Sequence, residues 1–124
     1  MSIPKRFTIA ESSHRERELA ASYRDLRAQV VQDVRSAYAN ASTAIRQAVF
    51  LRDELVPAAR DAYRVASTSY QLGAASALEV IDARRALLDA EAQLADALAN
   101  ANTARADLDR ALGRTPFANG TQTR

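Results

Sequence analysis

Two residues interrupt an otherwise unbroken helical pattern. Between residues 12 and 112 the sequence holds one proline, Pro57, and one glycine, Gly73. Proline lacks a backbone N–H and glycine readily takes left-handed conformations, so these are the positions where a helix bends or ends. Alanine, the strongest helix former, makes up about a quarter of the chain. The sequence therefore predicts an all-α fold.

The first long helix is expected to begin near residue 13. Ser12 or Ser13 can cap free backbone N–H groups, and Glu16 follows Ser13 at capping-box spacing. Beyond this start, apolar residues recur at gaps of three and four and predict one helix face. They are Leu19, Tyr23, Leu26, Val30, Val34, Ala37, Ala41, Ile45 and Ala48.

Pro57 interrupts this pattern without ending it. Apolar residues return directly after the proline, at Ala59, Ala62, Tyr63, Ala66 and Tyr70. Because a proline inside a helix either kinks it or starts a new one, we expect a single helix over about 13–71, bent near Pro57. Two separate helices are the alternative.

Gly73 predicts a sharp reversal. Glycine after a helix end satisfies the last carbonyl groups in a left-handed conformation. Ser76 can cap a following helix, and Glu79, three residues later, completes a second capping box. The next helix is expected over 76–112, ended by Gly113. The fold class is thus a long antiparallel helical hairpin.

The second helix carries a row of residues at heptad spacing that predicts coiled-coil packing, although two of its positions are charged. The row consists of Leu87, Glu91, Leu94, Leu98, Ala101, Arg105, Leu108 and Leu112. Alanine-rich seams bury little area per turn, and small chains without a normal core are usually stabilised by other means. With no cysteine in the chain, we expect association with further helices.

Three segments follow from these signals. Residues 1–11 are expected to be irregular, residues 12–113 to form the hairpin, and residues 114–124 to be a disordered polar tail. The first ten residues lack the apolar region of a signal peptide. No apolar run approaches the ~20 residues that a membrane-spanning helix needs, so the chain is expected to be soluble.

The charge pattern and residue inventory argue against several function classes. Net charge is +2 with acids and bases interleaved, unlike the basic surface of a nucleic-acid-binding protein. His14, the one histidine, stands near Glu16 and Glu18, but residues two apart fall on different helix faces, so no metal site is expected. The isolated glycines form no phosphate loop. We expect no enzyme, no catalytic residue and no cofactor.

Two acids, Glu79 and Asp82, follow the turn directly. An acid in the first turn of a helix is stabilising there, which explains Glu79. Asp82 lies about one turn deeper, where capping no longer requires a carboxylate. If several hairpins stood in a ring, these carboxylates would form a charged collar, as acidic rings do in cation-selective pores.

The segment from Tyr70 to Gly113 contains an ordered set of motifs: Tyr70, Gly73, Ser76, the run Leu78-Glu79-Val80-Ile81-Asp82-Ala83 and a terminal Leu112-Gly113. With the upstream AQVVQDVRSAY and the helical Pro57, they resemble the TolC-type outer-membrane efflux channel family, in particular its heavy-metal and multidrug branches. The resemblance covers about residues 15–113 and matches the helical hairpin of the second repeat. Each motif is weak alone, and their order and spacing together are specific.

This resemblance implies roles for the residues around the turn. Leu72, Gly73, Ala74 and Ser76 match the tip that contacts a periplasmic adaptor protein. Tyr70, Glu79 and Asp82 match gate and pore-lining positions. Ala75 departs from the family, because some members carry an arginine there that pairs across the closed gate.

The resemblance also implies partners and a location. Complete family members are trimeric channels in the outer membrane of Gram-negative bacteria, with their helices in the periplasm and an inner-membrane pump linked through the adaptor. This chain then corresponds to a helical fragment, expected to form a dimer or a larger bundle and to bind no nucleic acid. The alternative is a generic coiled-coil interaction or scaffold module.

Overall fold

The computed structural model describes residues 3–114, with side chains from residue 8 onward. In these residues the backbone is helical throughout apart from the turn at 72–76 and the end after residue 111, which confirms the all-α hairpin. The residues group into two compact units, one up to Ser36 and one from Ala37 onward. The elements are α1 (Ile3–Phe50), the π-helical turn η1 (Leu51–Leu55), α2 (Val56–Gln71) and α3 (Ala77–Ala111).

The first unit is the part of α1 up to Ser36. Since α1 begins at Ile3, the irregular segment predicted for residues 1–11 and the helix start near residue 13 are wrong for the described residues. The Oγ atoms of Ser12 and Ser13 donate instead to the carbonyl oxygens of Ile9 (3.1 Å) and Ala10 (2.9 Å). Serine satisfied in this way is compatible with a helix interior.

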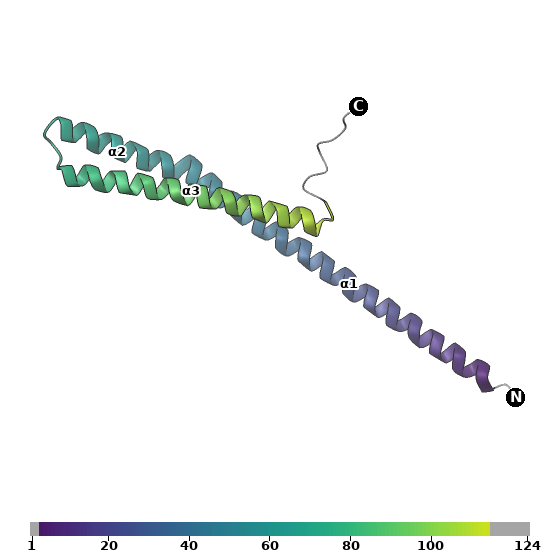
Figure 1. Ribbon diagram of the computed structural model, residues 1–124. Helices are drawn as coiled ribbons and strands as arrows, with labels where there is room; N and C mark the ends of the chain where they lie inside the picture. The colour runs from purple at the N-terminus through teal and green to yellow at the C-terminus, as the bar shows by residue number, and fades with distance from the viewer. Residues whose placement is uncertain (1–2, 115–124) are drawn as a thin grey trace, which may run out of the picture. The chain divides into compact units, whose positions relative to one another are not determined.

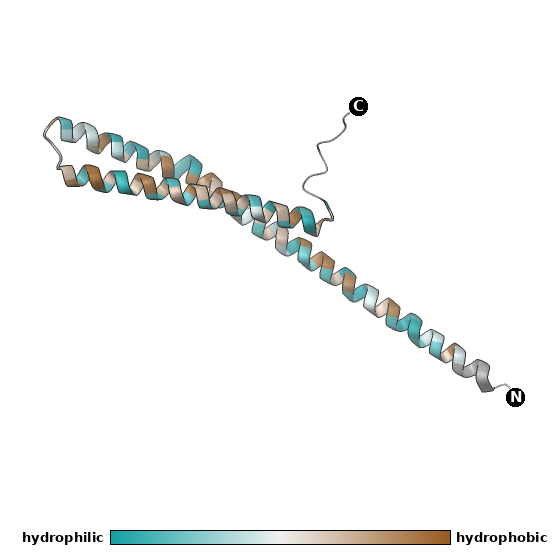
Figure 2. Ribbon diagram, in the orientation of Figure 1, coloured by the Kyte–Doolittle hydropathy of each residue, from teal (hydrophilic) through white to brown (hydrophobic). Residues whose placement is uncertain are grey.

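The side chains of this unit are exposed, with Ser13 and Val34 half-buried. Large apolar residues alternate with polar ones along the ribbon (Figure 2). Leu19 and Tyr23, for example, are 70% and 68% exposed. Across the described residues, no helix combines the length and apolar character that crossing a membrane requires. The polar tail predicted for 114–124 falls outside the described residues, except for Arg114.

The second unit keeps a continuous helical backbone through the region of Pro57. Leu55 and Val56 both have right-handed helical torsions, and the N–H of Val56 donates to the carbonyl of Leu51, five residues earlier. A π-turn of this kind inserts one residue into the helix. The helical backbone expected to continue past Pro57 is present. η1 ends two residues before the proline, which lies in the first turn of α2.

η1 also carries an ion pair between neighbouring residues. Arg52 contacts Asp53 through Nε–Oδ1 (2.6 Å) and Nη2–Oδ2 (3.0 Å). The hydrogen bond from Arg52 lowers the pKa of Asp53, and the same bond raises the pKa of Arg52. Both side chains are at least half exposed, so this pair contributes little to stability.

The reversal between α2 and α3 has the geometry predicted at Gly73. Gly73 has a φ of 76°. Its N–H donates to the carbonyl of Tyr70 (3.0 Å), and the N–H of Ala74 donates to that of Ser69 (2.8 Å). These two bonds form a Schellman motif, which satisfies the last carbonyls of α2. Gly113 closes α3 in the same way, with a φ of 71°.

The capping box predicted at the start of α3 is confirmed. The backbone N–H of Glu79 donates to Oγ of Ser76 (3.3 Å), and the backbone N–H of Ser76 donates to Oε2 of Glu79 (2.6 Å). Two N–H groups at the helix start are thereby satisfied. Because the Schellman motif ends at Ala74 and the cap begins at Ser76, the turn is very short (Figure 1).

α3 lies beside α2 and η1 in the second unit (Figure 1). It uses a row of buried and half-buried residues spaced alternately three and four apart, the pattern of a coiled-coil seam. The row is Val80, Ala83, Leu87, Ala90, Leu94, Ala97, Ala101, Ala104, Leu108 and Ala111. Ala97 packs with Ala48 and Leu51 in the buried cluster.

Half of the seam predicted for α3 is wrong. Leu87, Leu94, Ala101 and Leu108 do belong to the half-buried row, but the positions predicted to alternate with them, Glu91, Leu98, Arg105 and Leu112, are exposed. The alanines at 90, 97, 104 and 111, each one residue earlier, take their place. Alanine occupies these seam positions because its small side chain lets the two helix backbones approach closely. The larger and charged residues lie beside the seam.

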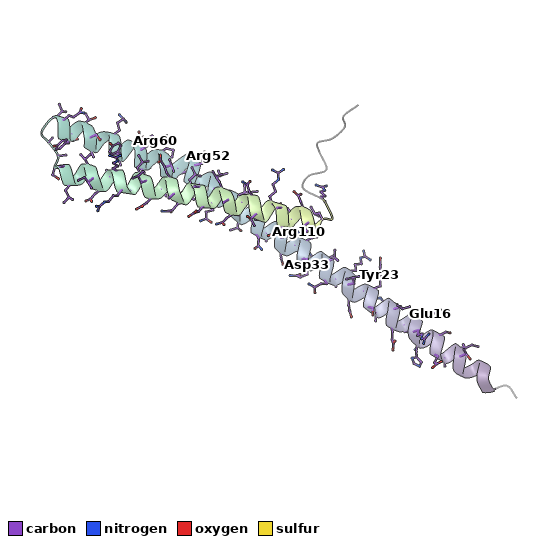
Figure 3. All side chains as sticks on the ribbon, viewed as in Figure 1. Glu16, Tyr23, Asp33, Arg52, Arg60 and Arg110 are labelled. Atoms are coloured by element: carbon purple, nitrogen blue, oxygen red, sulfur yellow. The ribbon has the colours of Figure 1, made fainter. Side chains whose placement is uncertain are left out.

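Glu91 still links the two arms, although it lies outside the seam. Its Oε1 accepts a hydrogen bond from Nη2 of Arg60 on α2 at 3.3 Å. Figure 3 labels Arg60 on the α2 side of the hairpin. Both side chains are substantially exposed, so the pair contributes more to the register of the arms than to their stability.

Candidate functional site

The residues predicted to contact a partner lie together at the hairpin tip. Leu72 is 78% exposed, and Gly73, Ala74 and Ser76 are exposed as well. Tyr70, in the last turn of α2, is 51% exposed. Leu78, in the first turn of α3, adds another apolar side chain that is 64% exposed. The tip thus offers apolar side chains on a short, rigid turn.

The two acids after the turn differ in what their carboxylates do. Oε2 of Glu79 accepts hydrogen bonds from the backbone N–H (2.6 Å) and from Oγ (3.3 Å) of Ser76. Asp82 is exposed, and within residues 3–114 no hydrogen bond or ion pair engages it. Glu79 therefore holds the turn together, and Asp82 is the carboxylate available to solvent and ions.

Asp82 begins an acidic row along α3. Asp89 and Asp96 follow at seven-residue spacing, and all three side chains are exposed. Residues seven apart lie nearly above one another on a helix, so the three carboxylates share one face. Between them stand Ala86 and Gln93, also exposed and without charge. Exposed Arg85, three residues after Asp82 and four before Asp89, stands beside this face, which we call the acidic flank.

A second exposed face of α3 is apolar. Ile81 and Leu88 are 47% and 54% exposed, at the same seven-residue spacing. Each stands one residue before an aspartate of the acidic flank, which rotates it by about 100° around the helix. Together with Leu78 they form the apolar flank. Its row continues through the exposed alanines Ala92, Ala95 and Ala99, and Arg85 interrupts it between Ile81 and Leu88.

α3 therefore presents three distinct faces: the alanine seam towards α2 and η1, an apolar flank and an acidic flank. An ordinary two-helix coiled coil needs only the first, because its outer positions are usually polar all round. An exposed apolar flank indicates contact with another helix. A continuous acidic flank beside it indicates a face that stays in water and attracts cations.

Side chains that could hold a metal do not gather anywhere in the described part of the chain. No three or more histidine, cysteine, aspartate or glutamate side chains there come together as a metal site would require. His14 is exposed on α1, as are Glu16 and Glu18. Figure 3 shows the side chains of this region spreading away from the helix axis.

The sequence reading missed the two flanks of α3. Their signal was present, because Asp82, Asp89 and Asp96 recur every seven residues, as do Ile81 and Leu88. The wrong seam phase concealed it. Once Ala83, Ala90 and Ala97 are placed in the seam, the apolar row and the acidic row lie at the remaining positions, with Arg85 between them.

Comparison with known proteins adds one match. The model of a protein family described as outer membrane efflux protein matches residues 6–114 of the chain. The matched region contains nearly all of α1, together with η1, α2, the tip and α3. No curated protein and no solved structure matches the chain.

Proposed function

Because this chain belongs to the outer membrane efflux protein family, we propose that it forms part of the wall of a periplasmic export tunnel. Its hairpin tip docks on an adaptor protein that links the channel to an inner-membrane pump. The role is structural and conducting, without catalysis or cofactor. Such a channel serves export of drugs or heavy metals from a Gram-negative bacterium, with its barrel in the outer membrane.

The three-faced pattern of α3 carries this proposal. A wall helix needs a neighbour on each side and an aqueous surface towards the conduit. The seam supplies one neighbour, the apolar flank offers a place for a second, and the acidic flank suits the aqueous surface. A generic coiled-coil scaffold, the alternative, would require neither the exposed row of Ile81 and Leu88 nor the exposed row of Asp82, Asp89 and Asp96 at seven-residue spacing.

The apolar flank supports assembly with further copies. In the full-length family the channel is trimeric, and we propose that this fragment forms a dimer or a larger bundle through the same flank. Ile81 and Leu88 lie in one row on the same side of the helix, and burying such side chains contributes about 1.5–3 kcal/mol each.

The tip supports adaptor docking. Leu72 is 78% exposed on a turn held by the Schellman motif and the capping box. Burying this exposed apolar side chain in a pocket would remove apolar surface from water, which favours its use as a contact. Gly73, Ala74 and Ser76 leave the backbone around it accessible.

The gate residues divide into two roles. We assign Asp82 to the charged entrance, because its carboxylate is free to attract cations. Glu79 positions the turn through its bonds to Ser76 and contributes less to the entrance. Tyr70 remains a proposed gate contact, exposed in the last turn of α2. Ala75, which is half-buried, offers no charged group to pair across the gate.

Self-association through the apolar flank is directly testable. Replacing both Ile81 and Leu88 with aspartate is expected to weaken association at least tenfold in sedimentation velocity experiments, because each exposed carboxylate would have to be desolvated in the contact. The control is Arg105→Asp, an exposed charge reversal on the same helix, 17 residues beyond Leu88. An unchanged distribution for the double variant, or a natural chain that is monomeric at micromolar concentration, would contradict this face as the contact.

A further inference from the structure

The seam of the long arm changes phase at η1. Before the π-turn, buried and half-buried positions recur at alternating gaps of four and three: 37, 41, 44, 48, 51 and 55. After it, the same alternation restarts one residue later, at positions 56, 59, 63 and 66. Positions 58, 62 and 65, where the first phase would have continued, are exposed. The sequence of this arm therefore contains one residue more than a continuous heptad pattern allows.

η1 absorbs that extra residue. The bond from the N–H of Val56 to the carbonyl of Leu51 spans five residues instead of four. Without this insertion the helix beyond it would be rotated by about 100°, the angle of one residue. Val56, Ala59 and Tyr63 would then turn away from α3, whose own seam has no such interruption.

Packing differs on the two sides of the π-turn. The body zone, residues 37–56 and 90–111, contains all the buried residues among the described side chains: Ala41, Ala48, Leu51, Val56, Ala90 and Ala97. The tip zone, residues 57–89, reaches only half burial, at Ala59, Tyr63, Ala66 and Leu87 among others. Less apolar burial means less stabilisation for each turn of helix.

The tip zone also contains an unsatisfied polar atom. Oγ of Ser67 is buried and has no hydrogen-bond partner, and it stands alone in this respect among the described side chains. A buried hydroxyl without a partner is destabilising. The Arg60–Glu91 hydrogen bond lies where the two zones meet. Because both side chains are exposed, it contributes little to holding the two arms together there.

We infer that η1 divides the hairpin into two zones that open separately, with the tip zone opening while the body zone stays closed. The extra residue absorbed by η1 keeps the long arm facing the seam of α3 in both zones. η1 lies at the boundary between them. Cooperative units with fewer buried contacts open at lower free energy than the rest of a structure. This division follows from contacts within the single hairpin and does not rest on the proposed function.

Amide hydrogen exchange of the natural chain tests this division. Seam amides of the tip zone, excluding the helix ends, are expected to exchange at least tenfold faster than those of the body zone, with one common rate within each zone. Exchange that is equal in the two zones, or that rises smoothly from residue 51 to the tip, would overturn the inference.

A phase variant tests the role of the insert. Deleting Asp53 and replacing Pro57 with alanine joins the two seam phases into one continuous alternation. Exchange in the tip zone is then expected to slow at least fivefold towards that of the body zone, since the helix no longer needs a π-turn. Pro57→Ala alone, which retains the extra residue, is the matched control and is expected to keep the two rates apart. An unchanged ratio in the deletion variant counts against the proposal.

Distance measurements on the chain without the deletion provide a readout that does not depend on whether the deletion variant folds. The chain has no cysteine, so introduced pairs can be spin-labelled uniquely. Exposed pairs are Gln47→Cys with Leu98→Cys in the body zone and Arg64→Cys with Ala86→Cys in the tip zone. The tip pair is expected to give a distance distribution at least twice as wide, and equal widths would contradict separate opening.

Discussion

Replacing Ala97 with leucine is expected to destabilise the hairpin by about 2–3 kcal/mol, although leucine is the more apolar residue. Ala97 is 5% exposed and packs with Ala48 and Leu51. Three additional carbon atoms there would force the arms apart or the side chain out of its preferred rotamer, and overpacking of a filled core costs about 1–3 kcal/mol. The measurement is urea unfolding followed by circular dichroism at 222 nm.

The matched control is Ala62→Leu on α2, away from both flanks of α3. Ala62 is exposed, and leucine is nearly as good a helix former as alanine, so the change is expected to stay within about 0.5 kcal/mol. If both substitutions proved neutral, or if Ala97→Leu increased stability, the two arms would not approach each other closely at the seam.

Replacing Gly73 with proline is expected to destabilise the hairpin by at least about 3 kcal/mol and to disorder the tip. Gly73 has a φ of 76°, which proline cannot adopt because its ring fixes φ near −65°. The substitution also removes the N–H that bonds the carbonyl of Tyr70. Thermal unfolding measures the loss, and in the full-length parent the same change is expected to reduce tolerance to the exported drug or metal.

Gly73→Ala separates backbone strain from loss of the bond. No atom lies within 4 Å of a Cβ built at this position, so alanine meets no steric obstacle and retains the N–H. Its cost should be only the left-handed conformation, about 1–2 kcal/mol. A loss as large for alanine as for proline would show that space, rather than conformation and hydrogen bonding, makes this position a glycine.

The features that could be predicted from the sequence are those with local causes. Gly73, Ser76 and Glu79 specify the turn through bonds among residues within a few positions of one another. Each residue type there has few alternative uses, so its spacing is informative. The same holds for Gly113 at the end of α3, which repeats the motif of Gly73.

The features that could not be predicted depend on the partner helix. Alanine is compatible with seam and surface alike, so a chain rich in alanine supports more than one heptad phase, and Leu98 and Leu112 favoured the wrong one. Ser12 and Ser13 are ambiguous for a similar reason, because a serine hydroxyl can cap a helix or bond a carbonyl within it. η1 also depends on the partner helix. The extra residue changes the seam phase within the long arm, and this change is recognised only against the uninterrupted seam of α3.

The position of the candidate residues beside the turn was expected from the sequence, and the structure adds the contacts that their side chains make. The residues from Tyr70 to Asp82 do lie at and after the turn, as the sequence indicated. The capping role of Glu79 was expected from its spacing to Ser76, and the structure adds that the carboxylate of Asp82 has no such bond within the described residues. The acidic flank likewise follows from the corrected seam.

Site-specific photo-cross-linking in the full-length parent tests whether the hairpin tip docks on a periplasmic adaptor protein. A photoreactive residue replaces Leu72 at the tip, or Arg52 on the outer side of η1 as the control, both exposed in this chain. We expect an adduct between the periplasmic adaptor protein and position 72, and none from position 52. Absence of an adduct at position 72 in cells that still export, or equal adducts at both positions, would contradict the tip as the docking element.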